Sequence, residues 1–214
     1  MNITEALRHQ RLVAIVRGTE PAAATRTVLT LAEEGITLVE VSLNTPGALD
    51  VISRARAALG AGAQVGAGTV ITADDADRAA GAGAEFVVTP AITQGLHTAV
   101  GRGLPVLAGA LTPTEVMTAT QAGAAAVKLF PASLGGVRYL RALLDPFPEA
   151  TLVPVGGVDA DAARDYLAAG AVAVGIGSPL VGDAASGGPP EELRARARRF
   201  LAAVREAPRP GERP

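Results

Sequence analysis

Eight short apolar runs, each followed by a stretch with helical character, constrain the fold of this 214-residue chain more than any other feature. They are the pattern expected of parallel strands that are covered on both faces. The runs lie at residues 13–16, 38–43, 64–67, 85–89, 105–108, 126–130, 152–155 and 172–176. This alternation predicts an α/β fold, a single-domain (β/α)8 barrel (TIM barrel) with a short N-terminal helix. An open doubly wound sheet has the same local pattern and is the main alternative.

Helix boundaries are marked between the apolar runs. The segment TPTE at residues 112–115 offers Thr as N-cap, Pro at the first helical position and Glu three residues after the cap. The segment at residues 158–170 has Asp159 near its start and closes on Gly170. We therefore assign residues 1–205 to the barrel, with a loop at residues 182–190 before the last helix. We expect residues 206–214 to form a disordered tail.

Four of the expected helices end in a glycine that precedes a strand, and this repeat suggests a register. Five residues after these glycines (35, 83, 123 and 170) come Glu40, Val88, Lys128 and Gly175, on the four even-numbered strands. In a barrel, alternate strands contribute one layer of four inward side chains. Shared register would place Glu40 and Lys128 in one interior layer, and Gly175 would leave room there for a group that is not protein. A slip of one residue would turn either side chain outward.

Lys128 is the only lysine among 19 basic residues, and it lies in an apolar run. A buried ammonium is costly to desolvate and gives up its proton more readily, and the neutral amine attacks ketones to form a Schiff base. The iminium accepts electrons from a breaking bond, and Glu40 could move the protons of that cleavage. A structural Glu40–Lys128 ion pair is the alternative, although arginine would serve a plain ion pair equally well.

Two glycine loops follow the seventh and eighth strands, where barrels often bind phosphate. Gly156 and Gly157 form the first, and Gly177 and Ser178 the second. Glycines let backbone N–H groups approach an anion, although such pairs also simply make tight turns.

Two further side chains end strands on the same side of the predicted barrel. Arg17 could hold a carboxylate through a two-pronged contact and Thr69 could add a hydroxyl donor. A surface arginine at the start of a loop is the alternative for Arg17.

Composition excludes several classes of protein. The net charge of −2 gives no basic footprint for nucleic acid or anionic lipid. The chain has no cysteine and two histidines far apart in sequence, so a thiol nucleophile is excluded and a histidine metal site is not expected, while an all-oxygen Mg²⁺ site stays open. The N-terminus lacks a signal-peptide pattern and no segment is long enough to span a bilayer, so we expect a cytoplasmic protein.

With these residues placed, nearly the whole chain resembles the class I 2-keto-3-deoxy-6-phosphogluconate (KDPG) aldolases and their 6-phosphogalactonate-specific (KDPGal) relatives. The matching segments, specific only in combination, are LVAIVRG, VEVSLNTPGAL, VGAGTV, VVTPAI, LTPTE, VKLFPAS, PVGGV and VGIGS. The resemblance implies a metal-independent homotrimer without a cofactor. It also implies cleavage of a 2-keto-3-deoxy-6-phospho sugar acid to pyruvate and glyceraldehyde 3-phosphate.

The resemblance also implies a role for each candidate residue. Lys128 would form the Schiff base and Glu40 would be the general acid and base. The implied substrate contacts are a carboxylate site at Arg17 and Thr69, pocket walls at Pro90 and Phe130, and a phosphate site at Gly156, Gly157, Gly177 and Ser178.

Two positions depart from the gluconate-type pattern. Many gluconate-type members have Arg where this chain has Asn44, which makes Arg17 the carboxylate anchor expected here. Many also have Thr where this chain has Val155, and valine cannot offer the hydrogen bond with which a hydroxyl would discriminate C4 epimers. The C4 preference therefore stays open, as does cleavage of 4-hydroxy-2-oxoglutarate. A non-catalytic phosphosugar-binding barrel and a phosphosugar isomerase or synthase are the rival functions.

Overall fold

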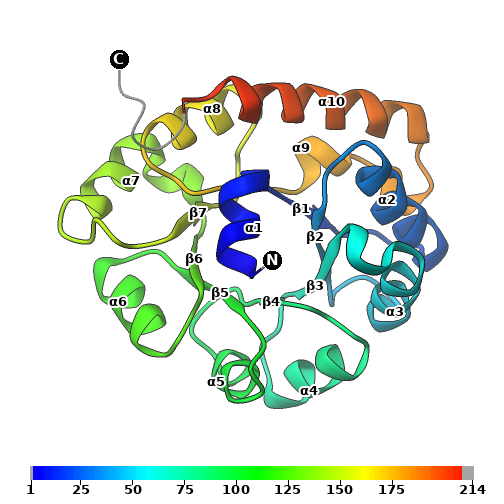
Figure 1. Cartoon of the computed structure of the whole chain (residues 1–214), viewed down its shortest axis with the longest axis horizontal. Helices are drawn as coiled ribbons and strands as arrows, with labels where there is room; N and C mark the ends of the chain where they lie inside the picture. The colour runs from blue at the N-terminus through cyan, green and yellow to red at the C-terminus, as the bar shows by residue number, and fades with distance from the viewer. Residues whose placement is uncertain (1, 209–214) are drawn as a thin grey trace.

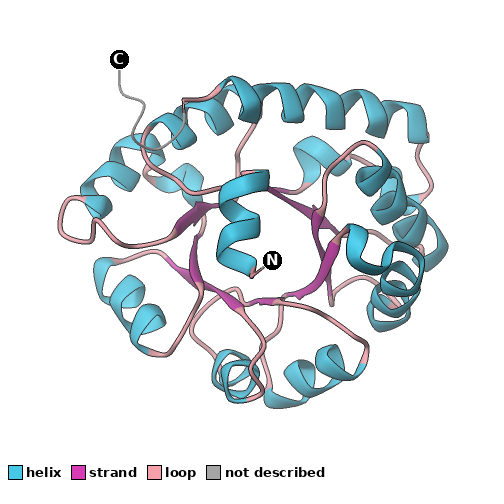
Figure 2. Ribbon diagram, in the orientation of Figure 1, coloured by secondary structure: helices cyan, strands magenta, loops and turns pink. Residues whose placement is uncertain are grey.

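The computed structural model describes residues 2–208 and shows eight parallel strands arranged as a barrel with helices around it (Figures 1 and 2). The strands are hydrogen-bonded in the order β7-β6-β5-β4-β3-β2-β1-β8, and a parallel bridge between Val155 and Gly175 joins the two ends. The prediction of a barrel is confirmed against the open sheet. The strands are β1 Leu12–Val16, β2 Leu38–Ser42, β3 Gln64–Gly68, β4 Val87–Val88, β5 Val106–Ala110, β6 Ala126–Leu129, β7 Leu152–Pro154 and β8 Val174–Ile176.

Helices connect successive strands and pack their apolar faces on the outside of the barrel. The predicted caps are present, since the Thr112 side chain accepts from the N–H of Glu115 and the Asp159 side chain accepts from the N–H of Ala162. The α-helices are α1 Ile3–Gln10, α2 Pro21–Glu33, α3 Ala48–Leu59, α4 Ala73–Gly81, α5 Gln94–Gly101, α6 Pro113–Gln121, α7 Gly136–Leu144, α8 Ala160–Ala168, α9 Ser178–Val181 and α10 Pro190–Glu206. Three 3₁₀ turns are η1 Gly60–Gly62, η2 Ala132–Leu134 and η3 Ala184–Ser186.

The short N-terminal helix α1 lies across one end of the barrel (Figure 1). Its buried residues Ile3, Ala6 and Leu7 join a cluster of interior side chains that includes Phe86 and Val88. Burial of these apolar groups closes the barrel at the N-terminal ends of the strands. The opposite end is left for a site. Within residues 2–208, none of the helices has the length and apolar character needed to cross a membrane.

Two predicted boundaries need correction. The expected loop at residues 182–190 contains η3, which packs closely enough on the first barrel loop that a Cβ on Gly18 would lie 2.0 Å from the Ala185 carbonyl oxygen. The expected tail also starts too early. Glu206 belongs to α10, and Ala207 is buried and accepts a 2.8 Å hydrogen bond from the Arg11 guanidinium at its carbonyl. Residues 209–214 of the predicted tail lie outside the described residues.

Candidate active site

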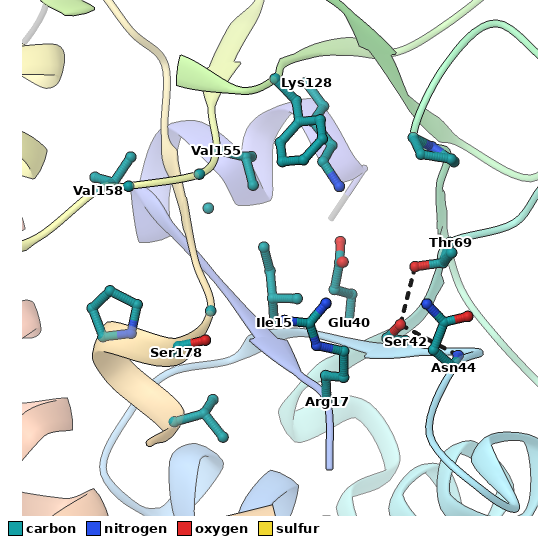
Figure 3. Close-up of a pocket in the computed structure, with 18 of the residues that line it drawn as sticks. Ile15, Arg17, Glu40, Ser42, Asn44, Thr69, Lys128, Val155, Val158 and Ser178 are labelled. Carbon is teal, nitrogen blue, oxygen red and sulfur yellow. Dashed lines mark hydrogen bonds between the residues drawn. The ribbon is translucent and has the colours of Figure 1, made fainter. Parts of the chain in front are cut away.

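A cavity of about 350 Å³ opens at the C-terminal ends of the strands (Figure 3). Its walls come from all eight βα connections except the one after β5. Every site residue expected from the sequence lines it, namely Arg17, Glu40, Thr69, Pro90, Lys128, Phe130, Gly156, Gly157, Gly177 and Ser178. The fold therefore brings together, in one cavity, side chains that are up to 161 positions apart in the sequence.

Lys128 is the third residue of β6, and its side chain extends into this cavity toward Glu40 (Figure 3). The residue is only 9% exposed. Its Nζ lies 5.2 Å from the centroid of the Phe130 ring, which offers the ammonium a cation–π contact in place of water. No ion pair with an N···O distance of 4.0 Å or less involves Lys128 within the part of the chain that the structure describes. The amine is thus sheltered from solvent without a contact ion pair.

Glu40 is the third residue of β2 and is 2% exposed. Its carboxylate rests on the backbone of Gly68, where an added Cβ would lie 2.5 Å from Oε1. Burial raises the pKa of Glu40, and the positive charge of Lys128 partly opposes this shift. A carboxyl group with a raised pKa exchanges protons more readily near neutral pH than an ordinary glutamate does.

The predicted interior layer is present, with one correction. Glu40, Lys128 and Gly175 line the cavity, and Val88 lies in the interior cluster. The room expected beside Gly175 is partly filled by protein, because a Cβ there would lie 2.6 Å from Cγ2 of Val155. Gly175 therefore leaves space for the Val155 side chain and also lines the cavity.

Thr69 follows β3 with a positive φ of 62°, a left-handed conformation that is unusual for a β-branched residue. Such a conformation costs on the order of 1 kcal/mol or more and persists where the surroundings enforce it. The hydroxyls of Thr69 and Ser42 lie 3.0 Å apart in a hydrogen bond, and Ser42 also accepts from the backbone N–H of Asn44 (Figure 3). Sequence reasoning missed Ser42, although its position two residues after Glu40 on one strand puts both on the same face.

The two glycine loops open onto the same cavity. Gly156 and Gly157 have φ values of 95° and 74°, which side chains rarely adopt, and a Cβ on Gly156 would lie 3.2 Å from the Phe130 ring. Gly177 precedes α9, and Ser178 is exposed at its start. Both loops therefore present backbone to the cavity at close range.

Arg17 is exposed at the end of β1, which pairs with β8. In Figure 3 its side chain reaches into the cavity between Ser178 and Ser42. This cation can meet an anionic group of a ligand on the open side of the cavity. Among residues 2–208, no group of three or more His, Asp or Glu side chains could hold a metal ion.

Together these features define a class: a (β/α)8-barrel enzyme whose cavity sets a buried amine opposite a buried carboxyl, beside two glycine loops suited to an anion. The family model for KDPG and KHG aldolases matches residues 3–187 of this chain. The chain belongs to this aldolase family.

Individual relatives agree with this assignment. A 2-dehydro-3-deoxy-6-phosphogalactonate aldolase of Escherichia coli K12 is 36% identical over 198 residues, which are 92% of this chain and 95% of the relative. A solved structure described as "Native KDPGal structure" matches with a TM-score of 0.86 and 36% identity, covering 92% of this chain and 95% of that one. The KDPG aldolase of Legionella pneumophila, solved with pyruvate captured at low pH as a covalent carbinolamine intermediate, matches with a TM-score of 0.78 and 27% identity over 95% of each chain.

Proposed function

We propose that this chain is a class I aldolase, an aldehyde-lyase that uses Lys128 to cleave a 2-dehydro-3-deoxy-6-phospho sugar acid to pyruvate and glyceraldehyde 3-phosphate. The observation that carries the proposal is the placement of the only lysine, buried in the cavity and directed toward the buried Glu40. The covalent carbinolamine of pyruvate in the Legionella relative supports the same amine chemistry here.

The reaction follows from the two side chains. The neutral amine of Lys128 attacks the C2 carbonyl, and loss of water from the carbinolamine gives an iminium. Glu40 removes the proton of the C4 hydroxyl, directly or through one water, while the C3–C4 bonding electrons move into the iminium. Glyceraldehyde 3-phosphate leaves as the aldehyde. Glu40 then returns a proton to C3 of the enamine, and hydrolysis releases pyruvate and regenerates the amine.

The remaining lining groups would hold the two ends of the substrate. We assign the substrate carboxylate to Arg17 and Thr69, because a guanidinium and a hydroxyl both donate to an anion. Pro90 and Phe130 would shape the wall beside Lys128.

We assign the phosphate to the loops of Gly156, Gly157, Gly177 and Ser178. Their place in the cavity lining supports this role, because three of the four residues are glycines that expose backbone there and backbone N–H groups are common ligands of phosphate. No cofactor is needed for this chemistry.

Borohydride reduction in the presence of pyruvate, followed by peptide mapping, tests the central step. A pyruvate-derived adduct on Lys128 is the expected result. A phosphosugar-binding barrel, or an isomerase or synthase, would leave Lys128 unmodified in protein that still binds a phosphorylated ligand. That result would reject the aldolase proposal, and a chelator would then distinguish a metal-dependent isomerase.

We further propose that the galactonate-type epimer is the preferred substrate. Val155 lines the cavity and presents only methyl groups there, so it cannot hydrogen-bond a C4 hydroxyl. The galactonate aldolase of E. coli, at 36% identity, supports the same choice. Comparison of kcat/KM for the two epimers tests it, and cleavage of 4-hydroxy-2-oxoglutarate is measured by the same release of pyruvate.

A homotrimer is the assembly we propose. Large apolar side chains are exposed near the open end of the barrel, with Leu134 at 71% and Ile71 at 48% exposure, and a subunit contact would cover them. Light scattering on the purified protein measures the assembly directly. The cytoplasmic location stays a prediction for cell fractionation to test.

A further inference from the structure

The short helix α9, which begins at the second glycine loop, is too short to be stable through its own hydrogen bonds. It has four residues, and its internal hydrogen bonds are few: the N–H groups of Leu180 and Val181 both bond to the Gly177 carbonyl, and that of Gly182 bonds to Ser178. A single helical turn is not stable in isolation, and its last carbonyls have no partner within the helix. The position of the Gly177–Ser178 backbone therefore depends on contacts outside the helix, which include the burial of the Leu180 and Val181 side chains and the bonds to the carbonyls at its far end.

Arg196 of α10 holds that far end. Its Nε donates to the Leu180 carbonyl at 2.8 Å and its Nη2 to the Val181 carbonyl at 3.0 Å. The half-buried guanidinium also forms an ion pair with Glu192, one turn earlier on α10, at 3.4 Å. A cation on the C-terminal carbonyls of a helix is favourable, because these oxygens carry partial negative charge.

We call these two hydrogen bonds from Arg196 the clamp, and Gly182 leaves space for it. Its φ is 57°, and a Cβ there would lie only 2.7 Å from Nη2 of Arg196. Val181 and Gly182 line the same cavity as Gly177 and Ser178. The guanidinium itself is absent from the lining, so it acts on the cavity through α9.

We infer that Arg196 is a positioning residue for the substrate phosphate: by binding the Leu180 and Val181 carbonyls it sets the Gly177–Ser178 loop at the distance that the phosphate requires. This inference rests on the proposed function, in which that loop binds phosphate. Loss of the clamp weakens binding of the phosphorylated end and leaves the chemistry at Lys128 unchanged.

The test compares Arg196→Met, Arg196→Lys and the control Arg198→Met in the full-length protein. Arg198 lies on the same helix and pairs with Glu34 at 3.8 Å, on the other side of α10 from this clamp. Two readouts are measured: kcat and KM with the phosphorylated keto acid, and the pyruvate concentration that half-saturates borohydride trapping on Lys128. The second readout involves no phosphate. Thermal unfolding verifies that each variant is folded.

In Arg196→Met we expect KM for the phosphorylated acid to rise about tenfold, which corresponds to about 1.4 kcal/mol and so to only part of what two charge-assisted hydrogen bonds contribute. We expect kcat and the half-saturating pyruvate concentration to stay within about twofold of wild type. Arg196→Lys keeps the charge and should give an intermediate KM, while Arg198→Met should match wild type.

An unchanged KM in both Arg196 variants would overturn the inference. A rise in KM matched by an equal rise in the half-saturating pyruvate concentration would also overturn it, because such parallel changes indicate general damage to the barrel. Failure of wild-type protein to cleave any phosphorylated keto acid, with pyruvate trapping intact, would overturn the proposed substrate class and this inference together.

Discussion

Gly68→Ala tests whether the Glu40 carboxyl, which we propose as the proton carrier, is held as the structure describes. A Cβ at this position would lie 2.5 Å from Oε1 and 2.9 Å from Cδ of Glu40. Ordinary contact begins near 3.4 Å, so the carboxylate must move by about 0.9 Å. Gly68 is not in the left-handed region, so alanine adds no backbone strain. A displacement of about 1 Å in a proton-transfer group costs on the order of a hundredfold in rate.

We therefore expect kcat for pyruvate release to fall about a hundredfold in Gly68→Ala, with a smaller change in KM. The assay is coupled reduction of pyruvate, and the final extent of borohydride trapping reports whether Lys128 still reaches pyruvate. Gly62→Ala is the matched control, because an added Cβ there meets nothing within 4 Å. A folded Gly68→Ala protein with wild-type kcat would refute the role of Glu40 as the proton carrier in this geometry.

Three further substitutions test the site. Lys128→Arg keeps the charge but cannot form an imine, so pyruvate release should fall at least about a thousandfold and trapping should disappear, in protein with an unchanged circular dichroism spectrum. Val155→Thr should shift the ratio of kcat/KM toward the gluconate-type epimer by about tenfold, measured with both epimers, and an unchanged ratio would show that another residue sets the preference. Glu40→Gln should lower kcat at least about a hundredfold. It should also change the pH dependence of stability: burial raises the pKa of Glu40, so its stabilising contribution is complete below the unfolded-state value of about 4 and is lost as pH rises through the folded-state pKa. Urea titrations between pH 4 and 8 should therefore show a smaller decline with rising pH in Glu40→Gln than in wild type, and equal declines would contradict the assigned shift.

The barrel and the inward register could be predicted because both are repeated along the chain. Eight apolar runs specify the strands, and a fixed distance from a helix-ending glycine placed Glu40 and Lys128 on interior positions. Because the pattern recurs along the chain, it remains recognisable where one element is irregular, as in the two-residue β4, Val87–Val88. The strand after Gly83 is short, yet its Val88 is still interior.

Features that depend on a neighbouring strand could not be predicted in the same way. The spacing placed Gly175 correctly but did not reveal that Val155 would lie against it, because the bridge between β7 and β8 exists only after closure. The same holds for Gly68. In the sequence it resembles any glycine at the end of a strand, and its importance follows only from the folded position of the Glu40 side chain beside it. A close approach that is possible only because a glycine has no side chain leaves no pattern in a single sequence.

The separation of Lys128 from Glu40 is itself an argument for catalysis over a structural ion pair. Two opposite charges buried in an apolar barrel gain most by direct contact, since each must be compensated for the water it has lost. Here both side chains enter one cavity, the amine is sheltered by Phe130, the carboxyl rests on Gly68, and the charges interact without an ion pair of 4.0 Å or less. Both groups face the cavity rather than each other in a contact pair, so each remains available to a ligand bound there. This arrangement favours catalysis over a purely structural ion pair.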